Sequence, residues 1–184
     1  MNYLKVLSLS ILSLLAMAWA QDASQQEGGL ERPLWQTLPL INAASGEEFR
    51  LADLEGQVVF VEAMATWCSN CRKQLQNASE AKAMLAEDEA LAEAISFVIL
   101  SIEGNLAPEK LNEYAQREDF DFIFAVASAD ILRELVTEFG RSITNPPSTP
   151  HFVIKPDGQY TDLITGIEPA ESIWVQLASL AESN

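Results

Sequence analysis

Three short apolar segments alternate with amphipathic segments along this chain, and this alternation restricts its fold more than any other feature. The apolar segments are rich in β-branched and aromatic residues and span 57–63, 96–102 and 122–127. Such runs are typical of strands that are covered on both faces. After each run, apolar residues recur every three or four positions, which predicts a helix. Strands joined by helices lie parallel in one sheet, so the sequence predicts an α/β fold.

Two predicted hairpins flank this βαβαβα unit. Their expected strands are 38–41 with 48–51, and 151–155 with 160–165. The second pair is joined by Pro156-Asp157-Gly158, where proline presets φ and glycine accepts a positive φ. A last helix is expected to begin near Pro169. We therefore expect a mixed central sheet that is flanked by helices and extended by an N-terminal β-hairpin.

The first 20 residues predict a secretory signal peptide. Lys5 precedes an apolar run over 6–17, and Ala18-Trp19-Ala20 supplies small residues at a cleavage site. An uncleaved membrane anchor stays open as an alternative, although the run is shorter than the roughly 20 residues that cross a bilayer. Residues 21–33 are polar and predict a flexible lead-in, which leaves 34–184 as one domain. We expect an extracytoplasmic location, in the periplasm or cell envelope, where disulfides persist.

The charge and the small number of metal-binding side chains exclude several function classes. Eleven Lys and Arg residues face 27 Asp and Glu residues, a formal net charge of −16. Such a surface repels phosphate backbones, so no nucleic-acid partner is expected. Two cysteines and one histidine are too few for a four-ligand Cys/His zinc site. A membrane partner is expected only if the leader is retained.

The two cysteines, Cys68 and Cys71, form the candidate catalytic centre. They lie between the first apolar strand and the helix after it. Unpaired N–H groups and the dipole at a helix start favour a thiolate, and the pKa in such C-x-x-C motifs falls from ~8.5 towards ~3.5–7.5. We predict that Cys68 attacks the disulfide of a partner and that Cys71 resolves the mixed disulfide. A purely structural bridge is the alternative, but so short a loop adds little stability.

Residues 58–72 (VVFVEAMATWCSNCR) resemble the active-site segment of TlpA/ResA-like thiol–disulfide oxidoreductases, which belong to the thioredoxin-like superfamily. The element order extends this resemblance over 34–184 and implies a thioredoxin-like fold with an added N-terminal hairpin. It implies no cofactor. It also implies partners with disulfides or dithiols, such as apocytochromes c, and an unidentified redox partner. The pair Ser69-Asn70 between the cysteines leaves the direction of electron flow open.

The resemblance implies a catalytic role for Glu62. It lies six residues before Cys68, where thioredoxins have a buried acid beneath the resolving cysteine. Burial would raise its pKa and let it exchange a proton with Cys71. In the alternative, Glu62 faces solvent or pairs with Lys73. Met64 departs from the family pattern, since an aromatic residue is usual there.

The resemblance also implies substrate-binding residues. Thr149-Pro150 matches the cis-proline that faces the cysteines in thioredoxin folds, so Thr149 is expected to pair with a substrate peptide. In the alternative, Pro150 is an ordinary trans proline. Trp67, directly before Cys68, completes the predicted substrate-binding set.

His151, directly after the predicted cis-proline, keeps two further functions open. It could stabilise the Cys68 thiolate or complete a metal site, or it is simply a satisfied polar residue at a strand start. SCO-like copper metallochaperones share this fold, and Cys68, Cys71 and His151 would suit Cu(I). Those proteins typically have one more residue between the cysteines. A peroxiredoxin-type peroxidase fits poorly, because its T-x-x-C spacing is absent.

Overall fold

The structure, a computed structural model, describes residues 32–183. The predicted signal peptide and nearly all of the predicted lead-in lie outside the described residues. Within the described range, no helix is both long enough and apolar enough to cross a membrane.

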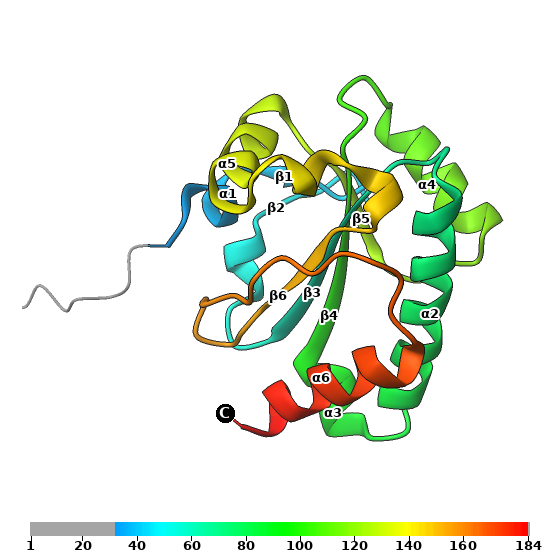
Figure 1. Ribbon diagram of the computed structural model, residues 1–184, viewed down its shortest axis with the longest axis vertical. Coiled ribbons are helices and arrows are strands. Elements are labelled where there is room, and N and C mark those ends of the chain that lie inside the picture. The colour runs from blue at the N-terminus through cyan, green and yellow to red at the C-terminus, as the bar shows by residue number, and fades with distance from the viewer. Residues whose placement is uncertain (1–31, 184) are drawn as a thin grey trace, which may run out of the picture. The chain divides into compact units, whose positions relative to one another are not determined.

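The centre of the fold is a four-stranded mixed sheet (Figure 1). Its strands, in spatial order, are β5 (Ile123–Val126), β4 (Ile95–Ser101), β3 (Val58–Met64) and β6 (His151–Ile154). The pairs β3–β4 and β4–β5 are parallel, and β6 is antiparallel to β3. All seven residues of β3 are buried, as its near-continuous apolar run predicts. These pairings confirm the predicted mixed α/β sheet.

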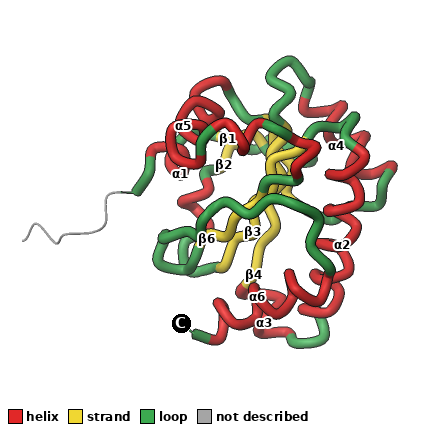
Figure 2. Tube along the Cα trace, viewed as in Figure 1, coloured by secondary structure: helices red, strands yellow, loops and turns green. Residues whose placement is uncertain are grey.

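Helices cover both faces of the sheet, and Figure 2 shows the strands between the two groups. One group contains α1 (Leu34–Thr37) and α5 (Ala129–Phe139). The other contains α2 (Ser69–Leu85), α4 (Pro108–Arg117) and α6 (Ala170–Glu182), with the short α3 (Glu89–Ala94) beside α6. The helix signals in the sequence are confirmed at Pro108, the first residue of α4, and at Gly140, which caps α5 with φ 75°.

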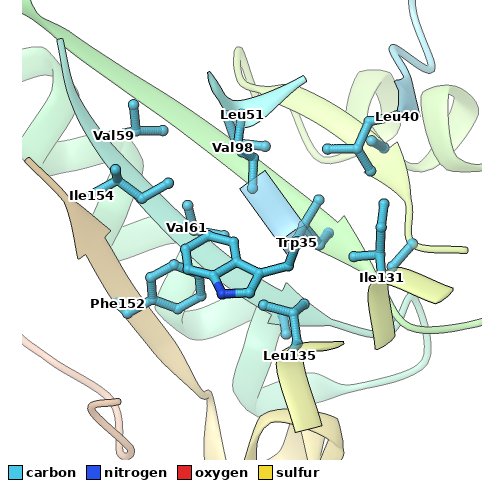
Figure 3. Close-up of a cluster of buried hydrophobic side chains, with 14 of the residues drawn as sticks. Trp35, Leu40, Leu51, Val59, Val61, Val98, Ile131, Leu135, Phe152 and Ile154 are labelled. Atoms are coloured by element: carbon cyan, nitrogen blue, oxygen red, sulfur yellow. The ribbon is translucent and has the colours of Figure 1, made fainter. Parts of the chain in front are cut away.

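Alternation along β3 gives the two faces of the sheet different cores. Val59, Val61 and Ala63 belong to the core beneath α1 and α5. Trp35 from α1 fills the middle of that core, with its ring centroid 5.3 Å from that of Phe152 (Figure 3). The intervening residues of β3 face α2 and its neighbours, because successive strand side chains point in opposite directions.

The two expected hairpins differ in regularity. The N-terminal hairpin is confirmed by the short antiparallel pair β1 (Leu40–Ile41) and β2 (Glu48–Phe49). After β6, the turn at Gly158 has the predicted positive φ of 84°. The expected strand 160–165, however, makes only isolated bridges to β6. Part of the reason is that the Thr161 hydroxyl, rather than a backbone carbonyl, accepts the Val153 N–H.

Three 3-10 helices were not predicted: η1 (Leu51–Leu54), η2 (Arg141–Thr144) and η3 (Pro146–Ser148). The short helices α1 and α3 were not predicted either. Each of these elements spans only three to six residues. Segments so short carry too little hydrophobic periodicity to reveal a helix.

Candidate active site

Cys68 and Cys71 are joined by a disulfide at the start of α2, with their Cα atoms 5.3 Å apart. Cys68 is the N-cap residue of the helix, and its Sγ accepts the Cys71 backbone N–H at 3.1 Å. This position confirms that the first sulfur lies at the helix N-terminus. When the disulfide is reduced, the N–H and the helix dipole both favour negative charge on Cys68.

The two sulfur-bearing residues differ in accessibility. Cys68 is 4% exposed, whereas Cys71 is completely buried. Trp67, directly before Cys68, is 67% exposed and is a large apolar side chain beside the disulfide. Of the two cysteines, only Cys68 therefore has any surface exposed to a partner's sulfur.

The loop before the cysteines is held by Glu103, which follows β4. The Thr66 N–H donates to Glu103 Oε2 at 2.6 Å, and the Thr66 hydroxyl donates to Oε1 at 3.2 Å. The Ser101 hydroxyl also donates to Oε2, at 3.3 Å. Charge-assisted bonds of this kind are stronger than neutral ones. Glu103 therefore fixes the backbone two residues before Cys68.

Sequence reasoning missed Glu103. A usable signal was its place directly after the apolar run of β4. The carboxyl ends of neighbouring parallel strands meet at one edge of a sheet, and ligand-binding and catalytic groups gather there in open α/β sheets.

The loop that contains η3 closes the other side of the site. The Pro146 carbonyl oxygen lies 3.1 Å from Cys71 Sγ, and Asn70 Nδ2 donates to the Pro147 carbonyl at 2.8 Å. The Thr149 N–H also donates to the Pro146 carbonyl, at 2.7 Å. The 146–149 segment therefore contacts the disulfide through Pro146 and the residue before Cys71 through Pro147.

The expectation of a cis bond before Pro150 is wrong. Residues 32–183 contain no cis peptide bond, so the Thr149–Pro150 bond is trans. The chain instead reverses through η3 and through Thr149, whose φ of 46° is in the left-handed region. That turn delivers Pro150 to the start of β6, where its carbonyl accepts the Ala63 N–H at 3.0 Å.

Thr149 is fully buried, and its backbone groups are both engaged within the chain. Its N–H is bonded to Pro146, and its carbonyl oxygen lies 2.8 Å from His151 Nδ1. In this conformation, neither group is free to pair with a peptide. The substrate-binding roles of Trp67, Thr149 and Pro150 stay predictions.

Glu62 is buried beneath the site, as predicted. Its side chain is inaccessible to solvent, and neither carboxyl oxygen has a hydrogen-bond partner among the described residues. Burial raises the pKa of Glu62 well above its ordinary value. The alternative in which Glu62 faces solvent or pairs with Lys73 is thereby wrong.

Glu62 shares one face of the sheet with the helix that carries the cysteines. In the same strand, Phe60 and Met64 point towards α2 and its neighbours, and Met64 packs in the cluster that contains both cysteines. Across the β3–β6 pair, Glu62 lies directly opposite His151. Side chains opposite one another in an antiparallel pair lie on the same face.

His151 is completely buried, and both of its ring nitrogens have partners. Nδ1 lies 2.8 Å from the Thr149 carbonyl, and Nε2 lies 2.8 Å from Glu168 Oε2. The ring also stacks on Phe60, with centroids 5.4 Å apart. Among the described residues, no three His, Cys, Asp or Glu side chains form a group placed to hold a metal ion. Cys68, Cys71 and His151 are therefore not preassembled as a three-ligand set.

The comparisons with known proteins agree with this arrangement. The SCO1/SenC family model matches residues 39–182. The chain belongs to the SCO1/SenC family. This assignment keeps the predicted thioredoxin-like superfamily and replaces the TlpA/ResA-like subgroup, which the family model does not support. No curated protein is significantly similar in sequence.

Solved structures show the same fold for this SCO1/SenC protein. A thiol:disulfide interchange protein from Chlorobium tepidum is 19% identical, with a TM-score of 0.64 over 78% of this chain and 92% of the other. A SCO1/SenC family lipoprotein from Bacillus anthracis is 23% identical, with a TM-score of 0.60 over 78% and 92%. Copper-bound ScoI from Arabidopsis thaliana is 13% identical, with a TM-score of 0.62 over 80% and 97%. These likenesses confirm the thioredoxin-like fold.

Two side chains of α2 that sequence reasoning missed hold the segment before α6. Gln74 Oε1 accepts the Glu168 N–H at 2.8 Å, and Asn77 Nδ2 donates to the Glu168 carbonyl at 2.6 Å. Figure 1 shows this segment passing beside α2 before α6 begins. Gln74 lies one turn after Cys71, and its Nε2 is buried with no partner among the described residues. A polar residue on the buried face of an amphipathic helix was the available signal.

Proposed function

We propose that this SCO1/SenC protein is a thiol–disulfide oxidoreductase that exchanges disulfides with cysteine-containing proteins outside the cytoplasm. The observation that carries the proposal is the Cys68–Cys71 disulfide at the N-terminus of α2, with the Cys71 N–H directed at Cys68 Sγ. The fold that it shares with a thiol:disulfide interchange protein of Chlorobium tepidum supports it further.

In the first step, the reduced protein attacks through Cys68. Its thiolate sulfur bonds to one sulfur of the partner's disulfide, and the other partner sulfur leaves as a thiolate that takes a proton from water. The N–H of Cys71 stabilises the attacking thiolate until the new bond forms. The product is a mixed disulfide between Cys68 and the partner.

In the second step, Cys71 resolves this mixed disulfide. Its thiol passes a proton to the Glu62 carboxylate and attacks Cys68 Sγ, and the partner's remaining sulfur leaves as a thiolate. Two electrons have then passed to the partner, and the Cys68–Cys71 disulfide is restored. Glu62 suits this role because burial raises the pKa of its carboxyl well above the ordinary value, which makes the carboxylate a stronger base. The same steps run in reverse when a partner dithiol is the reductant.

The proposed partners are proteins with accessible disulfides or dithiols. Apocytochromes c are one such class, and a second redox protein would restore the active form after each turnover. The proposed signal peptide at residues 1–20 would place this exchange in the periplasm or cell envelope.

Turnover of a protein disulfide tests the proposal. With dithiothreitol as the reductant, the protein is expected to accelerate insulin reduction, and Cys68→Ser is expected to abolish the acceleration. Cys71→Ser should lose turnover as well, while it retains the ability to form a mixed disulfide. Full activity of Cys68→Ser would refute the proposed function.

Copper binding is the second candidate function, because the family match and copper-bound ScoI of Arabidopsis thaliana both favour it. Cys68 and Cys71 supply two soft sulfur donors side by side, which suits Cu(I) as a cargo. His151 would have to break its hydrogen bond to the Thr149 carbonyl or to the Glu168 carboxylate before it could become a third ligand.

A titration of the reduced protein with Cu(I) tests whether the protein binds copper and whether His151 is a ligand. A histidine-ligated site predicts that His151→Ala binds Cu(I) at least tenfold more weakly than the wild type. Equal binding by the two proteins would exclude His151 as a ligand, and lack of binding by both would exclude the copper function.

A further inference from the structure

We propose that His151 and Glu168 are positioning residues of the redox centre. They hold the 146–149 turn so that the Pro146 carbonyl accepts a hydrogen bond from the Cys71 thiol in the reduced protein. The inference rests on the proposed function, because it concerns the dithiol form of the Cys68–Cys71 pair.

Cys71 is in direct contact with Pro146. Their sulfur and carbonyl oxygen are 3.1 Å apart, and in the disulfide form the sulfur has no proton to donate. After reduction, a Cys71 thiol can donate to this oxygen, whereas a thiolate cannot. The carbonyl has a second lone pair for the Thr149 N–H, so the two bonds can coexist. The contact therefore favours the reduced form and keeps the proton on Cys71 rather than on Cys68.

A strained turn sets the position of the Pro146 carbonyl. Thr149 has φ 46° and ψ 57°, a left-handed conformation that is unfavourable for a β-branched residue. The residue before a proline is also biased towards extended conformations. Thr149 departs from both preferences, so contacts from outside the turn must maintain its conformation.

His151 and Glu168 supply these contacts. A carbonyl oxygen only accepts, so His151 Nδ1 must carry the proton that bonds to Thr149. Nε2 on the opposite side of the ring is held by Glu168 Oε2 at 2.8 Å. The imidazole is thus fixed between the turn and Glu168, with Glu62 opposite it on β3 and Phe60 stacked on it.

Glu168 connects this arrangement to the helix that carries the cysteines. Glu168 is itself fixed by Gln74 and Asn77 of α2, which bind its backbone N–H and carbonyl. The Glu168 side chain is 26% exposed, whereas that of His151 is completely buried, so Glu168 is the more tolerant site for a substitution. A continuous chain of hydrogen bonds and contacts therefore runs from α2 through Glu168 and His151 to the 146–149 turn, and from there back to Cys71 on α2.

The experiment compares the Cys68–Cys71 disulfide of three variants with that of the wild type. Glu168→Ala removes the partner of His151, Glu168→Gln retains an oxygen acceptor, and Glu171→Ala alters an exposed acid of α6 without a described contact. Each full-length protein is equilibrated with reduced and oxidised glutathione, quenched and quantified. Urea unfolding of each oxidised protein reports any loss of stability separately.

Glu168→Ala is expected to shift the equilibrium towards the disulfide form by about three- to tenfold, the effect of one weakened hydrogen bond. Glu168→Gln is expected to stay within about twofold of the wild type, as a partial loss of the same bond, and Glu171→Ala is expected to match the wild type. A folded Glu168→Ala protein with the wild-type equilibrium would overturn the inference. So would an equal shift in Glu171→Ala.

A measurement on the wild type keeps the inference testable if Glu168→Ala does not fold. Nitrogen NMR of His151 is expected to show a protonated Nδ1 in both the oxidised and the reduced protein. An unprotonated Nδ1 in either form would overturn the inference. Neither the glutathione equilibrium nor the NMR measurement involves insulin or any other partner protein. These two measurements can therefore contradict the positioning role while insulin turnover supports the proposed function, or support the positioning role while insulin turnover is absent.

Discussion

The two faces of the central sheet differ in what they bury. The face beneath α1 and α5 is filled by apolar side chains around Trp35 (Figure 3). The face beneath α2 buries Glu62, Gln74 and His151 among apolar residues, next to the disulfide. Burial of a polar group is costly unless it is fully bonded, and Glu62 has no partner among the described residues. Trp35 Nε1 and Gln36 Oε1, beside the first face, also lack a partner among the described residues. The buried carboxyl and imidazole, Glu62 and His151, however, both lie on the second face. The cost of burying an ionisable group therefore falls on the second face, next to the disulfide.

The largest loss of stability is expected from a substitution on the apolar face of the sheet, beneath α1 and α5. Trp35→Ala removes a side chain that contacts Phe152, Phe139 and Tyr160, and it should lower the free energy of unfolding by about 3–5 kcal/mol. Urea unfolding of the oxidised protein measures this loss. The glutathione equilibrium of the folded variant should match that of the wild type, because Trp35 lies across the sheet from the cysteines. A large change in that equilibrium would contradict the division between the faces.

Glu62→Gln tests the polar face and should move activity and stability in opposite directions. Loss of the proton acceptor should slow resolution of the mixed disulfide by about 10²-fold, within the range of general acid–base effects. Stopped-flow measurement of the release of a bound thiol from Cys68 reports this step. An unchanged rate would remove Glu62 from the mechanism.

The same variant should show a pH-dependent gain in stability. Burial raises the pKa of Glu62 in the folded protein, so the folded state keeps this proton to higher pH than the unfolded chain. The wild type therefore loses stability relative to Glu62→Gln as pH rises above the ordinary value of 4.5, until it passes the raised pKa. Urea unfolding of both proteins from pH 4 to pH 8 measures the difference. A difference that does not grow with pH would contradict the burial of an unpartnered carboxyl.

The smallest of these effects is expected at the edge of the sheet, where Glu103 holds Thr66. Glu103→Ala should lower insulin turnover by about tenfold or less and the free energy of unfolding by about 1.5–3 kcal/mol, since the lost bonds are to a charged group. Glu109→Ala, an exposed acid at the start of α4, is the matched control. Equal effects of the two substitutions would show that Thr66 needs no such support.

The sequence was most informative where physical signals are local. Apolar runs and helical periodicity placed β3, β4, β5 and the longer helices, and the spacing of Cys68 and Cys71 located the redox centre. The burial of Glu62 was also predictable, because it interrupts an otherwise apolar strand. These features depend on neighbours only a few residues away.

The remaining parts of the site depend on contacts between distant segments. Glu103 lies 37 residues from Thr66, and Glu168 lies 94 residues from Gln74. No spacing rule within the sequence connects such pairs. The left-handed conformation of Thr149 depends in part on such a contact, since His151, which bonds to the Thr149 carbonyl, is held by Glu168, 17 residues further along the chain.

The most direct test of the account is covalent trapping on Cys71→Ser. The reduced variant is mixed with a peptide disulfide, quenched in acid and examined by mass spectrometry, with Cys68→Ser as the companion sample. A peptide adduct is expected on Cys68 in the first variant and none on Cys71 in the second, because only Cys68 has any exposed surface and lies at the helix N-cap. An adduct on Cys71, or none on Cys68, would contradict the account.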